Sequence, residues 1–162
     1  MALAVLSWIM AIPLLGFVTG LRTMTPMAIL CWFAWLGYLP VDGTWAFWVA
    51  KLPTALIFTL LAVGELVADK LPKIGDRTSP GPLAARLIFA GLIGAIIAAG
   101  LNGPGIEGVF LAVACSLAGA FCGFLLRREL VRQYSFKDWY VAVAEDIFTV
   151  GCAILAMGVI TG

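Results

Sequence analysis

Six apolar stretches follow one another along the chain, separated by charged residues and by clusters of proline and glycine. They cover residues 2–21, 26–39, 53–69, 83–101, 107–126 and 139–160. A helix that crosses the hydrocarbon core of a bilayer needs roughly 20 predominantly apolar residues. The pattern therefore predicts an all-α polytopic membrane protein, with about six membrane helices or helical hairpin segments in a single transmembrane domain over residues 1–162.

The second stretch is too short for an ordinary span. Its 14 residues would make about 21 Å of helix, against a hydrocarbon core of about 30 Å. It begins at Pro26, directly after Thr25. Thr25 suits an N-cap and Pro26 suits the first helical position. Two interpretations stay open: a capped turn at the interface, or a re-entrant hairpin of the first two stretches with its tip inside the membrane.

The composition agrees with a membrane protein and excludes several functions. The chain is 63% hydrophobic and 12% charged, whereas soluble domains are about 45–50% apolar and about 25% charged. Six spans would use about 120 residues, which leaves no room for a soluble catalytic domain. A net charge of +1 argues against nucleic acid as a partner, and the absence of histidine excludes an imidazole base or a histidine-ligated metal.

Basic residues are distributed unequally between the two predicted sides of the membrane. If all six stretches cross or enter it, nine of the ten lysines and arginines fall on the side of Arg22 and of loops 70–82 and 127–138, and only Lys51 falls on the other. Cytoplasmic loops carry the excess of basic residues. The chain is therefore expected to have these basic loops in the cytoplasm and both termini outside.

Several ionisable residues fall inside the apolar stretches or directly at their ends, at one expected depth in the cytoplasmic third of the bilayer. They are Arg22, Glu65, Asp69, Arg86, Arg127, Glu145 and Asp146. Such groups are costly in the membrane and are functional candidates by default. Either the three arginines neutralise Glu65, Asp69 and Glu145 in a network that only fixes helix register, or some of these charges face a substrate path.

The residues divide by charge into two predicted roles. An anionic group would bind at the N-terminus of the second helix, where Arg22, Thr23 and Thr25 offer a cation, two hydroxyls and a positive dipole end. The other candidate substrate-binding residues are Arg77, Arg86 and Arg127. The candidate coupling or ion-binding residues are Glu65, Asp69, Glu145 and Asp146.

Two further patterns bear on architecture. Three stretches per half permit a 3+3 inverted repeat, with Val63-Gly-Glu65 matching Val143-Ala-Glu145. Small residues recur every four positions in the fourth and fifth stretches, which allows close helix approach, either inside the bundle or in a homo-oligomer. These positions are Gly91, Ala95 and Ala99 in one stretch and Cys115, Gly119 and Gly123 in the other.

Five motifs together resemble a family of small bacterial integral membrane proteins that carries only a domain-of-unknown-function label. They are G-L-R-T-M-T-P (20–26), E-L-V-A-D-K-L-P (65–72), D-R-T-S-P-G-P-L-A-A-R (76–86), Arg127-Arg128 and A-E-D (144–146). The resemblance spans nearly the whole chain and implies no activity. It does imply a bacterial inner-membrane location. It also implies that the following residues are signature positions of the family: Arg22, Thr25, Pro26, Glu65, Asp69, Arg77, Arg86 and Glu145.

The predicted function is a small inner-membrane transporter or flippase-like carrier for an ion, a small anionic solute or a lipid headgroup. Membrane lipids are the expected partners, and no cofactor is expected. One alternative is a non-catalytic membrane scaffold. The other is an enzyme acting on a lipid-linked phosphate, in which Glu65 and Asp69 would hold a divalent metal; a role other than catalysis is favoured.

Overall fold

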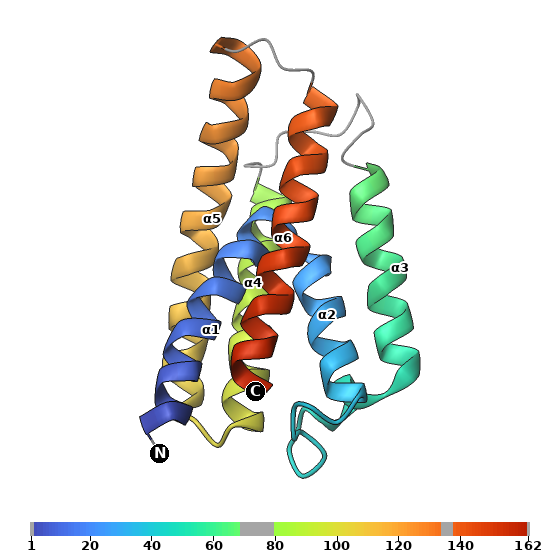
Figure 1. The fold of residues 1–162 in the computed structure, drawn as a ribbon, viewed down its shortest axis with the longest axis vertical. Helices are drawn as coiled ribbons and strands as arrows, with labels where there is room; N and C mark the ends of the chain where they lie inside the picture. The colour runs from blue at the N-terminus through green and yellow to red at the C-terminus, as the bar shows by residue number, and fades with distance from the viewer. Residues whose placement is uncertain (1, 69–79, 134–137, 162) are drawn as a thin grey trace.

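The computed structural model describes residues 2–68, 80–133 and 138–161, and these ranges contain helices and no strands. The six α-helices are α1 (Ala2–Leu21), α2 (Met24–Trp35), α3 (Leu52–Ala68), α4 (Pro80–Gly100), α5 (Gly105–Gln133) and α6 (Asp138–Thr161). A short 3₁₀ helix, η1 (Phe47–Ala50), precedes α3. The prediction of an all-α fold is confirmed (Figure 1).

Three of the helices, α4, α5 and α6, are long and apolar enough to cross a membrane. The shorter apolar helical segments are Trp8–Leu21 within α1, Met24–Trp35, which is α2, and Leu52–Ala68, which is α3. The middle helices of the two halves also differ in length, because α2 has 12 residues and α5 has 29. The number of crossings and the 3+3 repeat therefore stay predictions.

The central helix α1 packs closely against α5 because both helices carry small residues at the contact. A Cβ atom at Gly20 would overlap the carbonyl oxygen of Ser116, and a Cβ atom at Gly119 would overlap that of Phe17. With no side chain at either glycine, the two backbones come into direct contact. Dispersion between closely packed backbones is the main attraction available to helices that share an apolar solvent.

Both small-residue faces predicted from the sequence lie against helices of the same chain. On α4, Gly91 contacts the side chains of Val109 and Val113 of α5. On α5, Gly119 and Gly123 contact α1. These glycines serve packing within the bundle, and a homo-oligomer stays a prediction.

Helix α2 ends at Trp35, earlier than the predicted stretch 26–39, because Gly37 closes it. Gly37 has a left-handed backbone with φ of +81°. Its N–H donates to the carbonyl of Ala34, and the N–H of Tyr38 donates to that of Phe33, both at 3.0 Å. The rings of Phe33 and Tyr38 also touch, with centroids 5.8 Å apart. This is the Schellman motif, in which glycine adopts the left-handed conformation at low cost.

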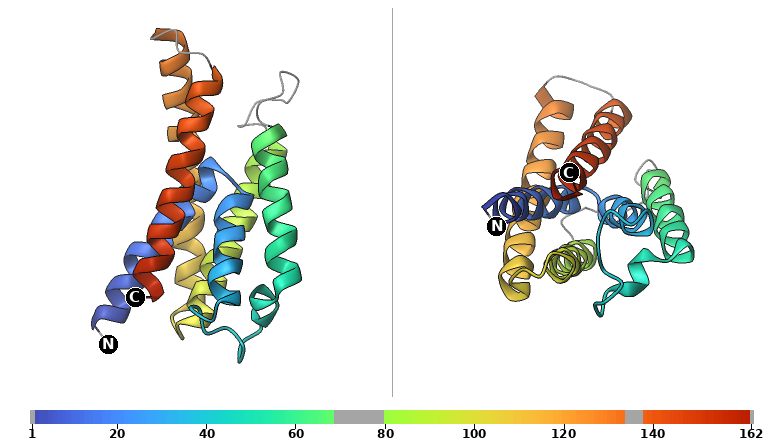
Figure 2. Two further views of the ribbon diagram at one scale, coloured as in Figure 1. Left: turned by 45° about the vertical axis from the view of Figure 1, so that its right-hand side comes forward. Right: turned by 60° about the horizontal axis from the view of Figure 1, so that its bottom comes forward.

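The turn between α1 and α2 lies inside the molecule. In Figures 1 and 2 it sits well below the upper ends of α5 and α6, near the level of the last turn of α3. Arg22 and Thr23, which form the turn, are 2% and 6% exposed. Both chain ends lie at the opposite, lower end of the bundle. Two antiparallel helices thus carry their connecting turn into the protein interior.

Helix α5 continues past the predicted end of its stretch at residue 126 and reaches Gln133. Its 29 residues make about 43 Å of helix, more than the hydrocarbon core requires. Arg127 and Arg128 therefore lie on a helix, and the prediction of a loop over 127–138 is wrong for its first part.

Candidate functional site

The N-terminus of α2 differs from the predicted one. The helix begins at Met24, and Thr23 occupies the N-cap position, with a helical backbone (φ −73°, ψ −49°) and no side-chain capping hydrogen bond. The prediction that Thr25 caps a helix starting at Pro26 is therefore wrong. Thr25 lies in the first turn of α2, where it is buried.

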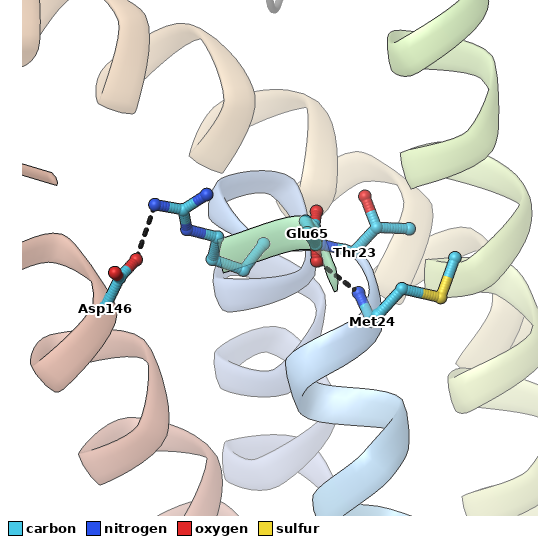
Figure 3. Close-up of polar contacts among 5 residues, drawn as sticks. Thr23, Met24, Glu65 and Asp146 are labelled. Carbon is cyan, nitrogen blue, oxygen red and sulfur yellow. Dashed lines mark hydrogen bonds and ion pairs between the residues drawn. The ribbon is translucent and has the colours of Figure 1, made fainter. Parts of the chain in front are cut away.

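Glu65, near the end of α3, caps α2 instead. One carboxylate oxygen accepts the backbone N–H of Thr23 and the other accepts that of Met24, each at 2.8 Å (Figure 3). These are two of the four N–H groups that a helix N-terminus leaves without an internal partner. A carboxylate also complements the positive end of the helix dipole. The predicted anion cradle therefore exists, and it holds an anion of the protein's own.

Arg86 of α4 binds the other side of the same turn. Its Nη1 donates to the carbonyl oxygen of Gly20 at 2.9 Å, in the last turn of α1, where the dipole is negative. The charges that act most on Arg86 are the attractive ones of Glu65 and Glu145 and the repulsive one of Arg22. At this internal turn, the end of α1 thus receives a cation and the start of α2 an anion.

Arg22 forms an ion pair with Asp146 of α6. Its Nη2 lies 2.5 Å from Oδ1 of Asp146, and the two side chains are 2% and 12% exposed (Figure 3). An isolated charge at this burial would be very costly, so each partner requires the other. The expected network paired the arginines with Glu65, Asp69 and Glu145; Asp146, which that network did not include, also pairs with Arg22.

Two buried polar atoms at the internal turn have no hydrogen-bond partner among the described residues. They are Oγ1 of Thr25 and Nε of Arg86. The side chains are 5% and 7% exposed, and buried polar groups in proteins are nearly always hydrogen-bonded, to protein or to ordered water. The internal turn therefore holds two buried polar groups whose hydrogen bonds the described residues do not supply.

Two further predicted residues line a groove. Arg127 and Glu145 lie between α5 and α6 there, together with Glu129 and Tyr140, and the charge of Glu145 also acts on Arg86. Asp69 and Arg77 lie outside the described residues. We call the turn residues Arg22 and Thr23, with Glu65, Arg86 and Asp146, the turn cluster.

The described residues contain no group of three or more His, Cys, Asp or Glu side chains that could hold a metal ion. Both oxygens of Glu65 already accept backbone N–H groups. The carboxylate thus faces the turn as a helix cap.

Sequence reasoning missed three features of this region. The contact of Arg86 with Gly20 and the capping role of Glu65 join residues far apart in sequence, 66 and 41–42 positions, and no local signal marks them. Tyr140 and Glu129 were not singled out as groove residues, although both stand next to the charged ends of their helices.

Comparison of the chain with protein-family models, with curated proteins and with solved structures gives no match. The resemblance to small bacterial membrane proteins therefore stays an expectation.

Proposed function

We propose that the chain is a small membrane carrier, of the transporter or flippase type, whose substrate-binding element is the turn cluster. The observation that carries this proposal is the carboxylate of Glu65 on the N-terminal N–H groups of α2. A helix N-terminus is a ready site for phosphate or carboxylate. Here a side chain from another helix occupies it, so a substrate anion can bind only when that side chain leaves.

Protonation of Glu65 supplies the means of exchange. A neutral carboxylic acid accepts hydrogen bonds from N–H groups less strongly than a carboxylate. A proton on Glu65 therefore releases the N–H groups of Thr23 and Met24 to an anion, next to Arg22 and the unpartnered Thr25 hydroxyl. Loss of the proton restores the cap and expels the anion. Proton binding and anion binding are coupled in this scheme.

The proposal also assigns a location, a topology and roles to the remaining charged residues. The protein lies in a bacterial inner membrane, crosses or enters it with six helical segments, and keeps its basic loops in the cytoplasm. Arg77, Arg86 and Arg127 attract the anionic group, whereas Asp69, Glu145 and Asp146 take part in coupling. Transport of an ion, a small anionic solute or a lipid headgroup fits this arrangement.

Proton flux tests the carrier proposal. The purified chain is reconstituted into liposomes that contain a trapped pH-sensitive dye, and an inward proton gradient is applied with inorganic phosphate outside as the coupled anionic probe. We expect the wild type to dissipate the gradient faster than empty liposomes. Glu65→Gln and Asp146→Asn should lower the rate of proton flux at least tenfold. The control Glu107→Gln, at an exposed position, should keep the wild-type rate. A wild type no faster than empty liposomes, or a folded Glu65→Gln as fast as the wild type, rejects the proposal.

The scaffold alternative has an observation in its favour, because Glu65 and Arg86 both bind helix ends, as purely structural caps would. Exchange of the ion pair, Arg22→Asp with Asp146→Arg, separates the two functions. A scaffold tolerates the exchange as long as the pair forms, whereas a carrier that uses the Arg22 charge at the turn folds but loses flux.

A further inference from the structure

Helix α3 lies at the edge of the bundle. It packs mainly on α2 and on the short η1 that precedes it, whereas α1 packs on α2, α4, α5 and α6. Figure 2 shows α3 on the outside, with α2 between it and α1. Among its 17 residues, Ala55 and Ala62 are buried. Helix α3 is thus attached to the bundle along one side.

The half of α3 next to η1 is held by aromatic side chains. The indole N–H of Trp32 in α2 donates to the hydroxyl of Thr59 at 2.9 Å. The ring of Phe58 contacts the rings of Trp48 in η1 and Phe89 in α4, with centroids 6.4 and 6.1 Å apart. These contacts reach three other elements, so they fix the position of this half.

The second half of α3, residues 60–68, is held mainly by a charge. Ala62, its buried residue, contributes only a methyl group, and Val63 next to it is 51% exposed. Glu65 forms the two hydrogen bonds with the backbone N–H groups at the start of α2. The charge of Glu65 also attracts Arg86 of α4. One carboxylate therefore accounts for most of the attachment of this half to the internal turn.

Exchange of Glu65 for a substrate anion needs space that the turn does not have in this structure. Arg22 and Thr23 are 2% and 6% exposed, so little room remains beside the carboxylate for an anion such as phosphate. Arg86 of α4 and Asp146 of α6 close the turn on other sides, and both belong to helices that pack on α1. The wall with the fewest contacts is α3.

We infer that α3 is the moving element of the carrier: it pivots about its η1 end, and the carboxylate of Glu65 is the latch that holds it closed. The inference rests on the proposed function for the claim that Glu65 leaves the start of α2, and it adds which part of the protein moves. Glu65 lies 13 residues beyond Leu52, which is about 20 Å along the helix. A small tilt at η1 thus opens the turn at the other end, as in a hinge.

Distances between pairs of nitroxide labels test the inference, measured by double electron–electron resonance on the purified full chain in detergent. The labels are attached to introduced cysteines, in a background whose four native cysteines are alanine. The reference label is at Ile147→Cys of α6, an exposed position. Its partner is either Val63→Cys, near the latch, or the matched Leu56→Cys, near η1, and both positions are exposed.

We expect Glu65→Gln, which removes the charge of the latch, to lengthen the distance from Val63 to Ile147. A tilt of about 15° at the start of α3 moves Val63 by about 4 Å and Leu56 by less than about 2 Å, since they lie about 16 Å and about 6 Å along the helix. The distance from Leu56 to Ile147 should therefore stay nearly unchanged. Glu107→Gln, at an exposed position of α5, should keep both wild-type distances.

Two results overturn the inference. An unchanged Val63 distance in folded Glu65→Gln means that α3 does not move and that Glu65 leaves the turn by rotation of its side chain alone. Equal lengthening of the Val63 and Leu56 distances means that α3 separates as a whole, without a pivot. Should Glu65→Gln fail to fold, inorganic phosphate added to the wild type replaces it in the experiment, with the same expected distances and the same two contrary results.

The carrier proposal is decided separately, by proton flux. A Val63 distance that lengthens in a chain that passes no protons keeps the pivot of α3 and rejects the carrier. Proton flux with an unchanged Val63 distance keeps the carrier and rejects the pivot.

Discussion

Glu65 supplies from α3 the cap that the sequence around α2 does not supply. Its two carboxylate oxygens accept two backbone N–H groups at a turn whose residues Arg22 and Thr23 are buried. The position thus requires an acceptor with two oxygens and a negative charge, which is what a carboxylate provides and a neutral side chain does not.

We expect Glu65→Gln to destabilise the protein by about 1–3 kcal/mol, because the amide presents an N–H group where a backbone N–H needs an acceptor. The measurement is the thermal unfolding midpoint in detergent. Glu107→Gln is the matched control, since Glu107 is exposed, and it should change stability by less than about 0.5 kcal/mol. Equal midpoints for the two variants would show that the cap contributes nothing to stability.

The ion pair of Arg22 with Asp146 makes a second prediction at this scale. Asp146→Asn leaves a buried guanidinium without its counter-charge and should cost about 3–5 kcal/mol. The double variant Arg22→Met with Asp146→Leu removes both charges and should recover a large part of that loss. The measurement is the thermal unfolding midpoint of the wild type, of Asp146→Asn and of the double variant. A double variant no more stable than Asp146→Asn contradicts the pairing.

At the scale of helices, the packing of α1 on α5 depends on glycines that admit no side chain. We expect Gly20→Ala to destabilise the protein by about 1–3 kcal/mol, because the added methyl group overlaps the backbone of α5. Gly64→Ala on the exposed face of α3 meets open space and should be neutral or stabilising, since alanine favours helix over glycine by about 1 kcal/mol. Equal losses in both variants would mean that close backbone approach is not the reason for Gly20.

Local signals explain which helix boundaries could be predicted. Charged residues and proline–glycine clusters delimit the six helices, so their number and order follow from the sequence. The end of α2 has a local signal too, because Gly37 is a C-terminal cap residue. Its start does not, because Thr25-Pro26 has the composition of a helix N-terminus while the actual cap comes from another helix.

The pairing of charges could be predicted only in part. The sequence places several ionisable groups at one depth, but Glu145 and Asp146 are adjacent on α6 and point in directions about 100° apart. Which of them meets Arg22 depends on how α6 is rotated, and that rotation is set by its packing on α1 and α2. The groove has the same origin, because it exists only where α6 leans away from α5.

At the scale of the whole molecule, the two ends of the bundle should face opposite sides of the membrane. Asp42, between α2 and η1, and Arg128, near the end of α5, are both exposed. The segment between α2 and η1 and the C-terminal end of α5 lie at opposite ends of the bundle (Figure 1). We expect a membrane-impermeant maleimide to label Asp42→Cys and not Arg128→Cys in intact cells, because the proposed orientation puts the basic end in the cytoplasm.

A background with the four native cysteines replaced by alanine makes this labelling specific. Both sites should react after the cells are opened, which shows that each cysteine is accessible. Labelling of Arg128→Cys in intact cells reverses the proposed orientation, and labelling of both sites places the two ends on one side.

The internal turn also has a consequence for the order in which the protein is made. The first two helices leave the ribosome with an arginine and free backbone groups at their tip, while the residues that complete them come from α3, α4 and α6. Non-helical backbone is not tolerated against lipid. In the proposed membrane arrangement, the nascent hairpin must therefore stay in a polar or protein-lined environment, such as the insertion machinery provides, until the last helix has been synthesised and Asp146 arrives.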